Sequence, residues 1–263
     1  MTRVTAIVIT FNEAANIRAA LASLSFADEI IVVDSQSTDD TVAIARTFTD
    51  KVIVRPWPGY IEQKNFAAAQ ASHDWILSLD ADERISEPLA GEIRALAEGS
   101  VAGYRMPRVT FHLGRWLRST DWYPDFQLRL YDRRRARWSG RLVHESVKAE
   151  GPVVDLTGEI LHYAYRDLAH HLQTMDRYTT LAARQMFEDG RTTGWWDLAI
   201  HPPAAFLRNY VLRGGFRDGV PGLIISAMNA RYVGLKFAKL WELCSASTST
   251  PPGPGAADSS KRS

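Results

Sequence analysis

The sequence predicts an α/β fold built on a mostly parallel sheet with helices on both faces. Two observations predict it. Strands and helical patterns alternate along the first part of the chain, and the strands are apolar on both faces rather than on one. Strands of this kind are buried on both sides, as in right-handed βαβ units. With 263 residues, of which 46% are hydrophobic, the chain is large enough for one large domain with an appendage.

Each predicted strand is followed by a helix or by polar residues. The strands span residues 4–10, 29–35, 51–57 and 74–80, and helical patterns lie near 13–24, 38–48 and 60–72. In parallel sheets, ligands bind at the edge where the carboxyl ends of the strands meet. The polar residues that follow the strands are Thr10, Asn12, Glu13, Asp34, Ser35, Ser37, Asp80 and Asp82. The sequence therefore predicts one site at this edge.

The fourth strand ends in an acidic stretch, WILSLDADERI, whose role the local sequence leaves open. Its carboxylates, Asp80, Asp82 and Glu83, suit a cap for the following turn. Asp80 and Asp82 are two residues apart in extended chain and therefore point the same way, which suits a hard cation such as Mg²⁺ or Mn²⁺. A carboxylate dyad for acid and base catalysis is the third explanation.

Composition and missing motifs exclude several classes of protein. The net charge of +1 gives no reason to expect nucleic acid as a partner. Cys244 is the only cysteine, which excludes a disulfide framework and fits a reducing compartment. Neither G-x-G-x-x-G nor G-x-x-x-x-G-K-[ST] follows the first strand, so no dinucleotide cradle or P-loop is expected. The first strand begins without a signal-peptide pattern, and we expect a cytoplasmic protein.

The last third of the chain changes character. A good amphipathic helix pattern covers 167–187, and residues 195–243 mix aromatic, aliphatic and basic side chains. Charged and amide residues interrupt every apolar run before it reaches the length of a spanning helix. Two structures fit this segment: helices lying in a membrane interface, or a helical cap on the sheet domain or on a second subunit.

The predicted boundaries follow from these changes of pattern. We expect a sheet domain over 1–165, a helical appendage over 166–244, and a disordered tail rich in Ser, Pro and Gly over 245–263.

Four motifs carry a resemblance to a known family. In this order and spacing they resemble the nucleotide-sugar half of family 2 glycosyltransferases with the Rossmann-like GT-A fold: ITFNEAANI, IVVDSQSTDDT, YIEQKNFAAAQA and LSLDADE. Two later segments resemble the subgroup of bacterial lipopolysaccharide inner-core β-glucosyltransferases: WYPDFQLRLYDRR and WSGRLVHESV. The resemblance implies an inverting, metal-dependent enzyme that uses Mg²⁺ or Mn²⁺. It would move a sugar, glucose from UDP-glucose, onto a lipid-linked glycan acceptor at the inner face of the cytoplasmic membrane.

The resemblance also implies roles for individual residues on the donor side. Asp80 and Asp82 would form the DxD pair, with Asp82 as the more direct metal ligand. Lys64 would place a cation near the donor phosphates, whereas its alternative is a solvated helical lysine. Asn12 suits either a cap for its helix or a nucleoside contact. The nucleoside itself would be held by Thr10, Phe11, Glu13 and Asp34.

Inversion requires a base opposite the leaving group, and the resemblance offers two candidates. Asp125 precedes an arginine-bearing segment, although Pro124 stands where many relatives have a second acidic residue. Glu145 is the other candidate, and its neighbour His144 resembles a histidine that completes a metal shell. Adjacent strand residues face opposite ways, so His144 and Glu145 point into one site only if the chain turns.

Arg129 and the basic run 132–137 are more typical of a solvated face, but facing the cleft they would suit an anionic acceptor. Two other functions fit the same motifs. One is transfer to a polyprenyl phosphate, and the other is nucleotide-sugar binding without turnover.

Overall fold

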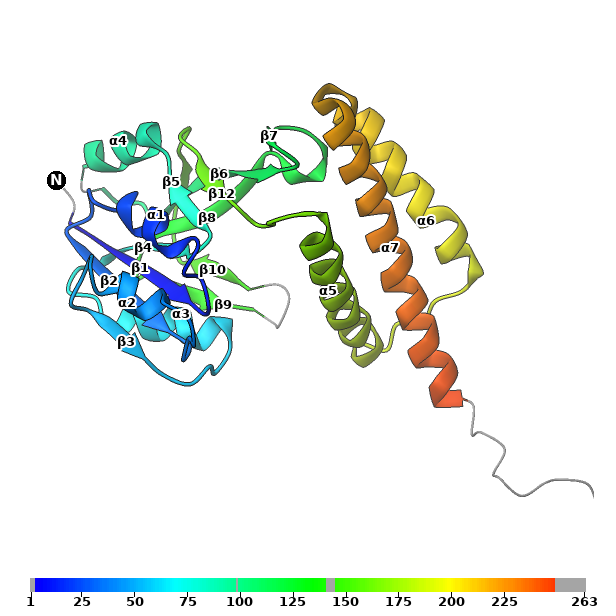
Figure 1. Cartoon of the computed structure of the whole chain (residues 1–263), viewed down its shortest axis with the longest axis horizontal. Helices are drawn as coiled ribbons and strands as arrows, with labels where there is room; N and C mark the ends of the chain where they lie inside the picture. Colours follow the sequence, from blue (N-terminus) through cyan, green and yellow to red (C-terminus); the bar gives the residue numbers. More distant parts are fainter. Residues whose placement is uncertain (1–2, 98, 141–144, 249–263) are drawn as a thin grey trace, which may run out of the picture.

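Figure 1 shows the computed structural model, which describes residues 3–97, 99–140 and 145–248. A sheet body formed by residues up to 165 stands beside a unit of three long helices that we call the helical unit. The predicted α/β class is confirmed in the sheet body, whose sheet is parallel in its first half and mixed in its second.

The first half of the sheet is parallel, as the alternating pattern predicts. Its strands lie in the order β3-β2-β1-β4. They are β1 (Val4–Thr10), β2 (Glu29–Asp34), β3 (Val52–Val54) and β4 (Trp75–Asp80), joined by α1 (Ile17–Ala22), α2 (Thr41–Ala45) and α3 (Tyr60–Ala69). β3 is shorter than predicted because Pro56 and Pro58, which follow it, have no N–H to donate to a ladder.

Both faces of this half are covered, which explains why its strands are apolar throughout. All seven residues of β1 are buried. Alternate residues such as Ala6 and Val8 pack with α1, α2 and α4 (Glu87–Ala95), and Ile7 and Ile9 pack on the other face with α3.

The second half of the sheet is mixed and continues the order as β4-β8-β6-β12-β5. Within the described residues, ten strands form this sheet, with β11 and β7 also paired to β6. The strands of this half are β5 (Glu83–Ile85), β6 (Gly103–His112), β7 (Arg115–Leu117), β8 (Asp125–Asp132), β11 (Val153–Asp155) and β12 (Ile160–His162). A separate pair, β9 (Ala136–Ser139) and β10 (Ser146–Ala149), packs against α3 and Tyr131.

Strand direction decides which residues reach the site. β8 runs antiparallel to β4, with Leu130 opposite Leu77 and Asp132 opposite Trp75. The first residue of β8, Asp125, therefore lies toward the edge where β4 ends, and the last, Asp132, lies at the opposite edge. β12 runs antiparallel to β5 and places His162 opposite Glu83.

The helical unit has its own packing. Its elements are α5 (Leu168–Glu188), α6 (Trp195–Leu207), η2 (Arg208–Leu212), η3 (Gly215–Asp218) and α7 (Gly219–Thr248). α7 packs against both α5 and α6, and its Phe237 and Leu240 form a small core with Ala183 and Met186 of α5. α7 continues beyond the predicted boundary at 244, while 249–263 of the predicted tail lie outside the described residues. Among the described helices, none combines the length and the apolar character needed to cross a bilayer.

Contacts of two kinds, one polar and one aromatic, join the helical unit to the sheet body. In the first, Ser119 Oγ donates a hydrogen bond of 2.5 Å to Asp218, and Arg208 pairs with Asp121 of η1 (Thr120–Trp122). In the second, which we call the aromatic joint, rings from both parts stack. The joint consists of His112, Trp122, Tyr165 and His171.

Candidate active site

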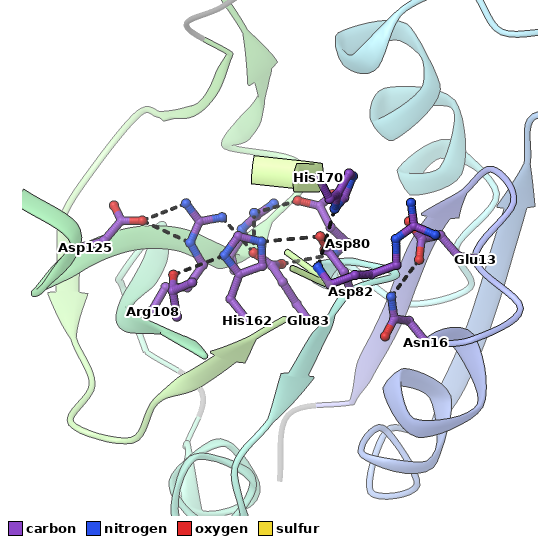
Figure 2. A network of polar contacts seen from close by, with 12 residues as sticks. Glu13, Asn16, Asp80, Asp82, Glu83, Arg108, Asp125, His162 and His170 are labelled. Atoms are coloured by element: carbon purple, nitrogen blue, oxygen red, sulfur yellow. Dashed lines mark hydrogen bonds and ion pairs between the residues drawn. The ribbon is translucent and has the colours of Figure 1, made fainter. Parts of the chain in front are cut away.

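The acidic stretch after β4 forms the centre of a polar network (Figure 2). Asp80, the last residue of β4, is held by two cations: its Oδ1 lies 3.0 Å from Lys64 Nζ, and its Oδ2 lies 2.8 Å from Arg129 Nη2. Burial alone would raise the pKa of Asp80, but Arg129 and Lys64 outweigh it and hold that pKa well below its usual range. Both oxygens of Asp80 are thus engaged within the protein.

Lys64 is buried, so the alternative of a solvated helical lysine is wrong. Its side chain is 4% exposed, and Nζ lies 4.0 Å from the centre of the Trp138 ring. Burial lowers the pKa of Lys64 even though Asp80 opposes that shift. The reason for the burial is tertiary: α3 packs against β9, which carries Trp138.

Arg129 is also buried, contrary to the expectation of a solvated face. Its side chain is 3% exposed, because it belongs to the second half of β8, which is buried throughout in the middle of the sheet. The basic run 132–137 lies away from the site, because it begins at the opposite edge of the sheet. There Arg133 donates to the carbonyls of Ala68 and Ala71, and Arg134 pairs with Asp132. The run therefore does not meet the condition, facing the cleft, under which it would suit an anionic acceptor.

Glu83 connects the donor-side carboxylates to Asp125. Its Oε1 accepts from Arg129 Nη2 at 3.0 Å and from Arg108 Nη1 at 2.9 Å. Arg108 in turn donates to Asp125 Oδ2 through Nε at 2.9 Å and Nη2 at 2.7 Å. The other oxygen of Asp125 accepts from Gln127 at 2.6 Å. Sequence reasoning missed Arg108, whose pairing with Asp125 depends on the register between β6 and β8.

Asp82 lies in the turn between β4 and β5 and faces a histidine. Its Oδ2 is 3.4 Å from His162 Nε2, and its carbonyl accepts from the Tyr163 backbone N–H at 2.9 Å. His162 was not predicted, because it lies 80 residues from Asp82 and only the pairing of β12 with β5 brings it there. His144, the predicted metal-shell histidine, lies outside the described residues.

Among the residues predicted to hold the nucleoside, Glu13 comes close to this network. Its carboxylate accepts from Asn16 Nδ2 at 2.8 Å. Burial raises its pKa, and the charges of Asp82 and Asp39 add to that rise while Asn16 opposes it. Figure 2 places Glu13 beside Asp82 at the end of the network away from Asp125.

The other predicted nucleoside contacts lie at the ends of β1 and β2. Thr10 is buried, and within the described residues its hydroxyl has no hydrogen-bond partner, whereas Phe11 is 56% exposed. Asp34 is fully buried and accepts twice from Ser37, at 2.8 Å to the backbone N–H and 2.5 Å to the hydroxyl. Asn12 does not cap a helix, because its side chain accepts from the Thr38 backbone N–H at 2.8 Å and thereby bridges two loops.

Glu145, the second candidate base, immediately precedes β10 and is half-buried. Its charge acts on Tyr60 at the start of α3, as does that of Asp80. Burial is the main reason that the pKa of Tyr60 rises to about 12. Asp125 belongs to β8 and contacts the network through Arg108, whereas Glu145 lies just before β10.

The chain matches a family model and several known proteins. The family model described as Glycosyl transferase family 2 matches residues 5–147. The lipopolysaccharide core biosynthesis glycosyltransferase LpsC of Rhizobium meliloti is 32% identical, over 90% of this chain and 91% of the relative. An uncharacterized glycosyltransferase of Rickettsia typhi is also 32% identical, over 92% and 88%.

A solved structure resembles the whole fold. It is the mannosyltransferase PcManGT of Pyrobaculum calidifontis in complex with GDP-Man and Mn²⁺, with a TM-score of 0.55 and 17% identity, covering 91% of this chain and 87% of that one. The likeness confirms the fold expected from the motifs.

Proposed function

The chain belongs to glycosyl transferase family 2, and from this premise we propose that it is an inverting, metal-dependent enzyme of lipopolysaccharide inner-core assembly. It transfers a sugar from a nucleotide donor, for which we expect UDP-glucose, to a lipid-linked acceptor. The observation that carries the proposal is the extent of the likeness to LpsC. It spans 90% of the chain and so includes the helical unit, which lies beyond the family model's match to 5–147.

The residues at the end of β4 fit a divalent cation. Asp82 and His162 offer an oxygen and an imidazole nitrogen 3.4 Å apart, and both are ligands for divalent metal ions. Across the described ranges, no three His, Cys, Asp or Glu side chains form a ready metal cage. Two protein ligands leave positions for diphosphate oxygens, which is how such cations are usually held beside nucleotides. When bound, the cation would stabilise the charge of the departing nucleoside diphosphate.

Asp80 has a different role in this proposal. Because Lys64 and Arg129 occupy both its oxygens, it positions those two cations near the diphosphate instead of binding the metal directly. Glu13, Thr10, Phe11 and Asp34 line the nucleoside end of the site, as the resemblance implies.

Asp125 is the base that we propose, with Glu145 as the alternative. Asp125 is 32% exposed and therefore open to an acceptor hydroxyl, and Arg108 fixes its orientation. To accept a proton, it uses lone pairs that Arg108 and Gln127 leave free.

Paired substitutions test this choice. Asp125→Asn should reduce turnover by about 10²-fold to 10⁴-fold, the usual contribution of a positioned proton acceptor, while the affinity for UDP with Mn²⁺ is unchanged. Glu145→Gln is the matched variant and should cost less. The reverse ranking would assign the role to Glu145. Release of UDP from UDP-glucose in the presence of lipopolysaccharide core acceptor measures turnover. A purified protein that consumes no nucleotide sugar with that acceptor would refute the proposed reaction.

We also propose that the helical unit binds the membrane surface through exposed apolar side chains, which we call the apolar surface. α6 lies on the side of α7 away from α5 (Figure 1), and α6 has one acidic residue, Asp197, which pairs with His201 of the same helix. Three basic side chains follow it in the chain: Arg208 and Arg213, which both pair with Asp121, and Arg217 of η3. The apolar surface consists of Trp195, Trp196, Ile200, Leu207, Val211, Leu212, Phe216 and Val220.

Charge favours an anionic membrane over a second copy of the chain as the occupant. A two-fold contact that brought Arg217 of both copies together would be repulsive, whereas anionic lipid attracts a basic residue near its surface by about 1 kcal/mol. The two structures expected for this segment, a helical cap on the sheet domain and helices lying in a membrane interface, thus apply to different residues. Ser119 and Asp218 belong to a contact with the sheet body, and the apolar surface remains exposed.

Flotation with anionic and neutral liposomes, at low and high salt, tests the membrane proposal. The protein should float with anionic liposomes, and less so at high salt. Changing Trp195 and Trp196 together to Ser should abolish flotation. Trp57→Ser is the matched control, because Trp57 is 44% exposed but lies after β3 in the sheet body. A parent protein that stays in solution with every liposome would refute membrane binding.

A further inference from the structure

Six charged side chains in the site alternate in sign along one continuous chain of contacts. Two of its links are the pairs of Lys64 with Asp80 and of Arg108 with Asp125. Between these two pairs, Arg129 and Glu83 complete the series. In order, the members are Asp125, Arg108, Glu83, Arg129, Asp80 and Lys64, and we call them the ion chain. It connects the proposed base with the proposed donor site, and Figure 2 shows most of it as one line of contacts.

Glu83 is the member on which both halves of the ion chain depend. Its side chain is 0% exposed, and its Oε1 accepts from both guanidinium groups, at 2.9 and 3.0 Å. Its Oε2 accepts from the backbone N–H of Asp80 at 3.1 Å. Both oxygens are therefore used, one to hold Arg108 and Arg129 and the other to hold the end of β4.

Electrostatics explains why a charge is needed at this position. Arg108 and Arg129 carry the same charge and meet at one oxygen atom, so a neutral side chain there would leave them repelling each other in a buried place. Burial by itself would lower the pKa of Arg108, and Glu83 together with Asp125 raises it above its usual value. The anion at Glu83 is thus what allows two guanidinium groups to sit close together in the sheet.

We propose that Glu83 is a positioning residue for transfer, which holds Arg108 so that Asp125 faces the acceptor in a fixed orientation. The inference rests on the proposed role of Asp125 as base. Glu83 itself touches no substrate in this proposal. It divides the charge of Arg108 between two carboxylates, so that Asp125 is oriented by Arg108 but is not its sole counter-ion.

Glu83→Gln tests the inference, because glutamine keeps the shape and removes the charge. Arg108 would then be left with Asp125 alone, which makes Asp125 a weaker and less well oriented proton acceptor. We expect kcat to fall about 10-fold to 100-fold. The acidic limb of the kcat profile should move to lower pH, because removal of a nearby negative charge favours the ionised carboxylate. The affinity for UDP with Mn²⁺, measured by calorimetry, should change less than about threefold, or 0.6 kcal/mol.

A matched control separates this effect from general damage. Glu159→Gln removes a carboxylate that pairs with Arg118 and accepts from Tyr123, away from the ion chain. This variant should leave the acidic limb of the pH profile of kcat at the same pH as in the parent protein. Loss of folded protein would lower the amplitude of the profile without moving its limb. If Glu83→Gln does not fold, Arg108→Lys replaces it, because lysine keeps the charge but cannot bridge Glu83 and Asp125 with a planar fork. It should lower kcat with little change in UDP affinity.

The outcomes distinguish this inference from the proposed function. Suppose that Glu83→Gln keeps the wild-type kcat and the acidic limb of its pH profile stays in place, while Asp125→Asn is inactive. This result would overturn the positioning role of Glu83 and leave the proposed base in place. A loss of UDP affinity as large as the loss of kcat would also overturn it, because Glu83 would then serve the donor. If Asp125→Asn keeps wild-type turnover, the assignment of the base fails first.

Discussion

Acid should weaken the aromatic joint that connects the helical unit to the sheet body. His112 and His171 are 2% and 4% exposed, and their ring nitrogens are 3.2 Å apart. Burial, with His112 and His170 adding to it, lowers the pKa of His171 from 6.5 to about 4. Burial also lowers the pKa of His112, against an opposing effect of Asp167. The joint is therefore built from two neutral imidazoles.

The sign and size of the effect follow from these values. Between pH 6.5 and about 4 the unfolded chain binds a proton at His171 that the folded chain does not, so stability is complete above this window and falls as pH falls through it. From pH 7 to pH 5, the contribution of His171 to the free energy of unfolding decreases by about 2 kcal/mol. His112 changes stability in the same direction.

Urea unfolding at pH 7 and pH 5, followed by tryptophan fluorescence, measures this loss. Trp122 is a local reporter, because its ring centre lies 5.4 Å from that of His171. His171→Phe keeps a ring to stack on Tyr165 but cannot take up a proton, so its stability should depend less on pH by about 2 kcal/mol. Carboxylates elsewhere titrate in both proteins and cancel in the comparison. An equal loss in parent and variant between the two pH values would refute the reasoning.

Three further predictions concern single residues. Asp82→Asn should make UDP binding independent of Mn²⁺ in calorimetry without lowering Tm, and a parent protein that binds UDP equally without Mn²⁺ would contradict the metal role. Arg129→Met should cost about 3 to 5 kcal/mol in urea unfolding, because it leaves Glu83 buried without that partner. A cost below about 1 kcal/mol would show that the pair behaves like a surface ion pair. Gly222→Ala should destabilise by about 1 to 3 kcal/mol, because the new Cβ would lie 1.8 Å from a carbonyl oxygen of η3. Gly91→Ala, with nothing within 4 Å, is its control and should not destabilise.

The parallel half of the fold could be predicted because its signals are local. The seven residues of β1 are all buried, and the sequence already shows an uninterrupted apolar strand there. Polar residues follow such strands at the edge where their carboxyl ends meet, so Glu13, Asp80 and Asp82 could be assigned to one site before any contact was known. The amphipathic pattern of α5 was equally readable, since its buried residues recur along one face.

The other half of the site could not be predicted, because its partners are far apart in the sequence. His162 reaches Asp82 through the pairing of β12 with β5, and Arg108 meets Asp125 through the pairing of β6 with β8. The burial of Arg129 was hidden for another reason. From Arg129 to Asp132 every residue of β8 is buried, so alternation along this part of the strand gives no signal of which side chains are solvated.

The place of β12 in the sheet has a consequence for where the molecule can be divided. β12 lies between β6 and β5, although it begins at Ile160, well after the family match ends at residue 147. A shortened protein ending at 147 would keep every donor-side motif and still lack the strand that pairs with β5 and with Arg108 to Thr110 of β6. Its open strand edges would favour pairing between molecules and hence aggregation. The segment that the family model matches is therefore not a complete folding unit, because the sheet body is complete only when residues 160–162 have joined the sheet.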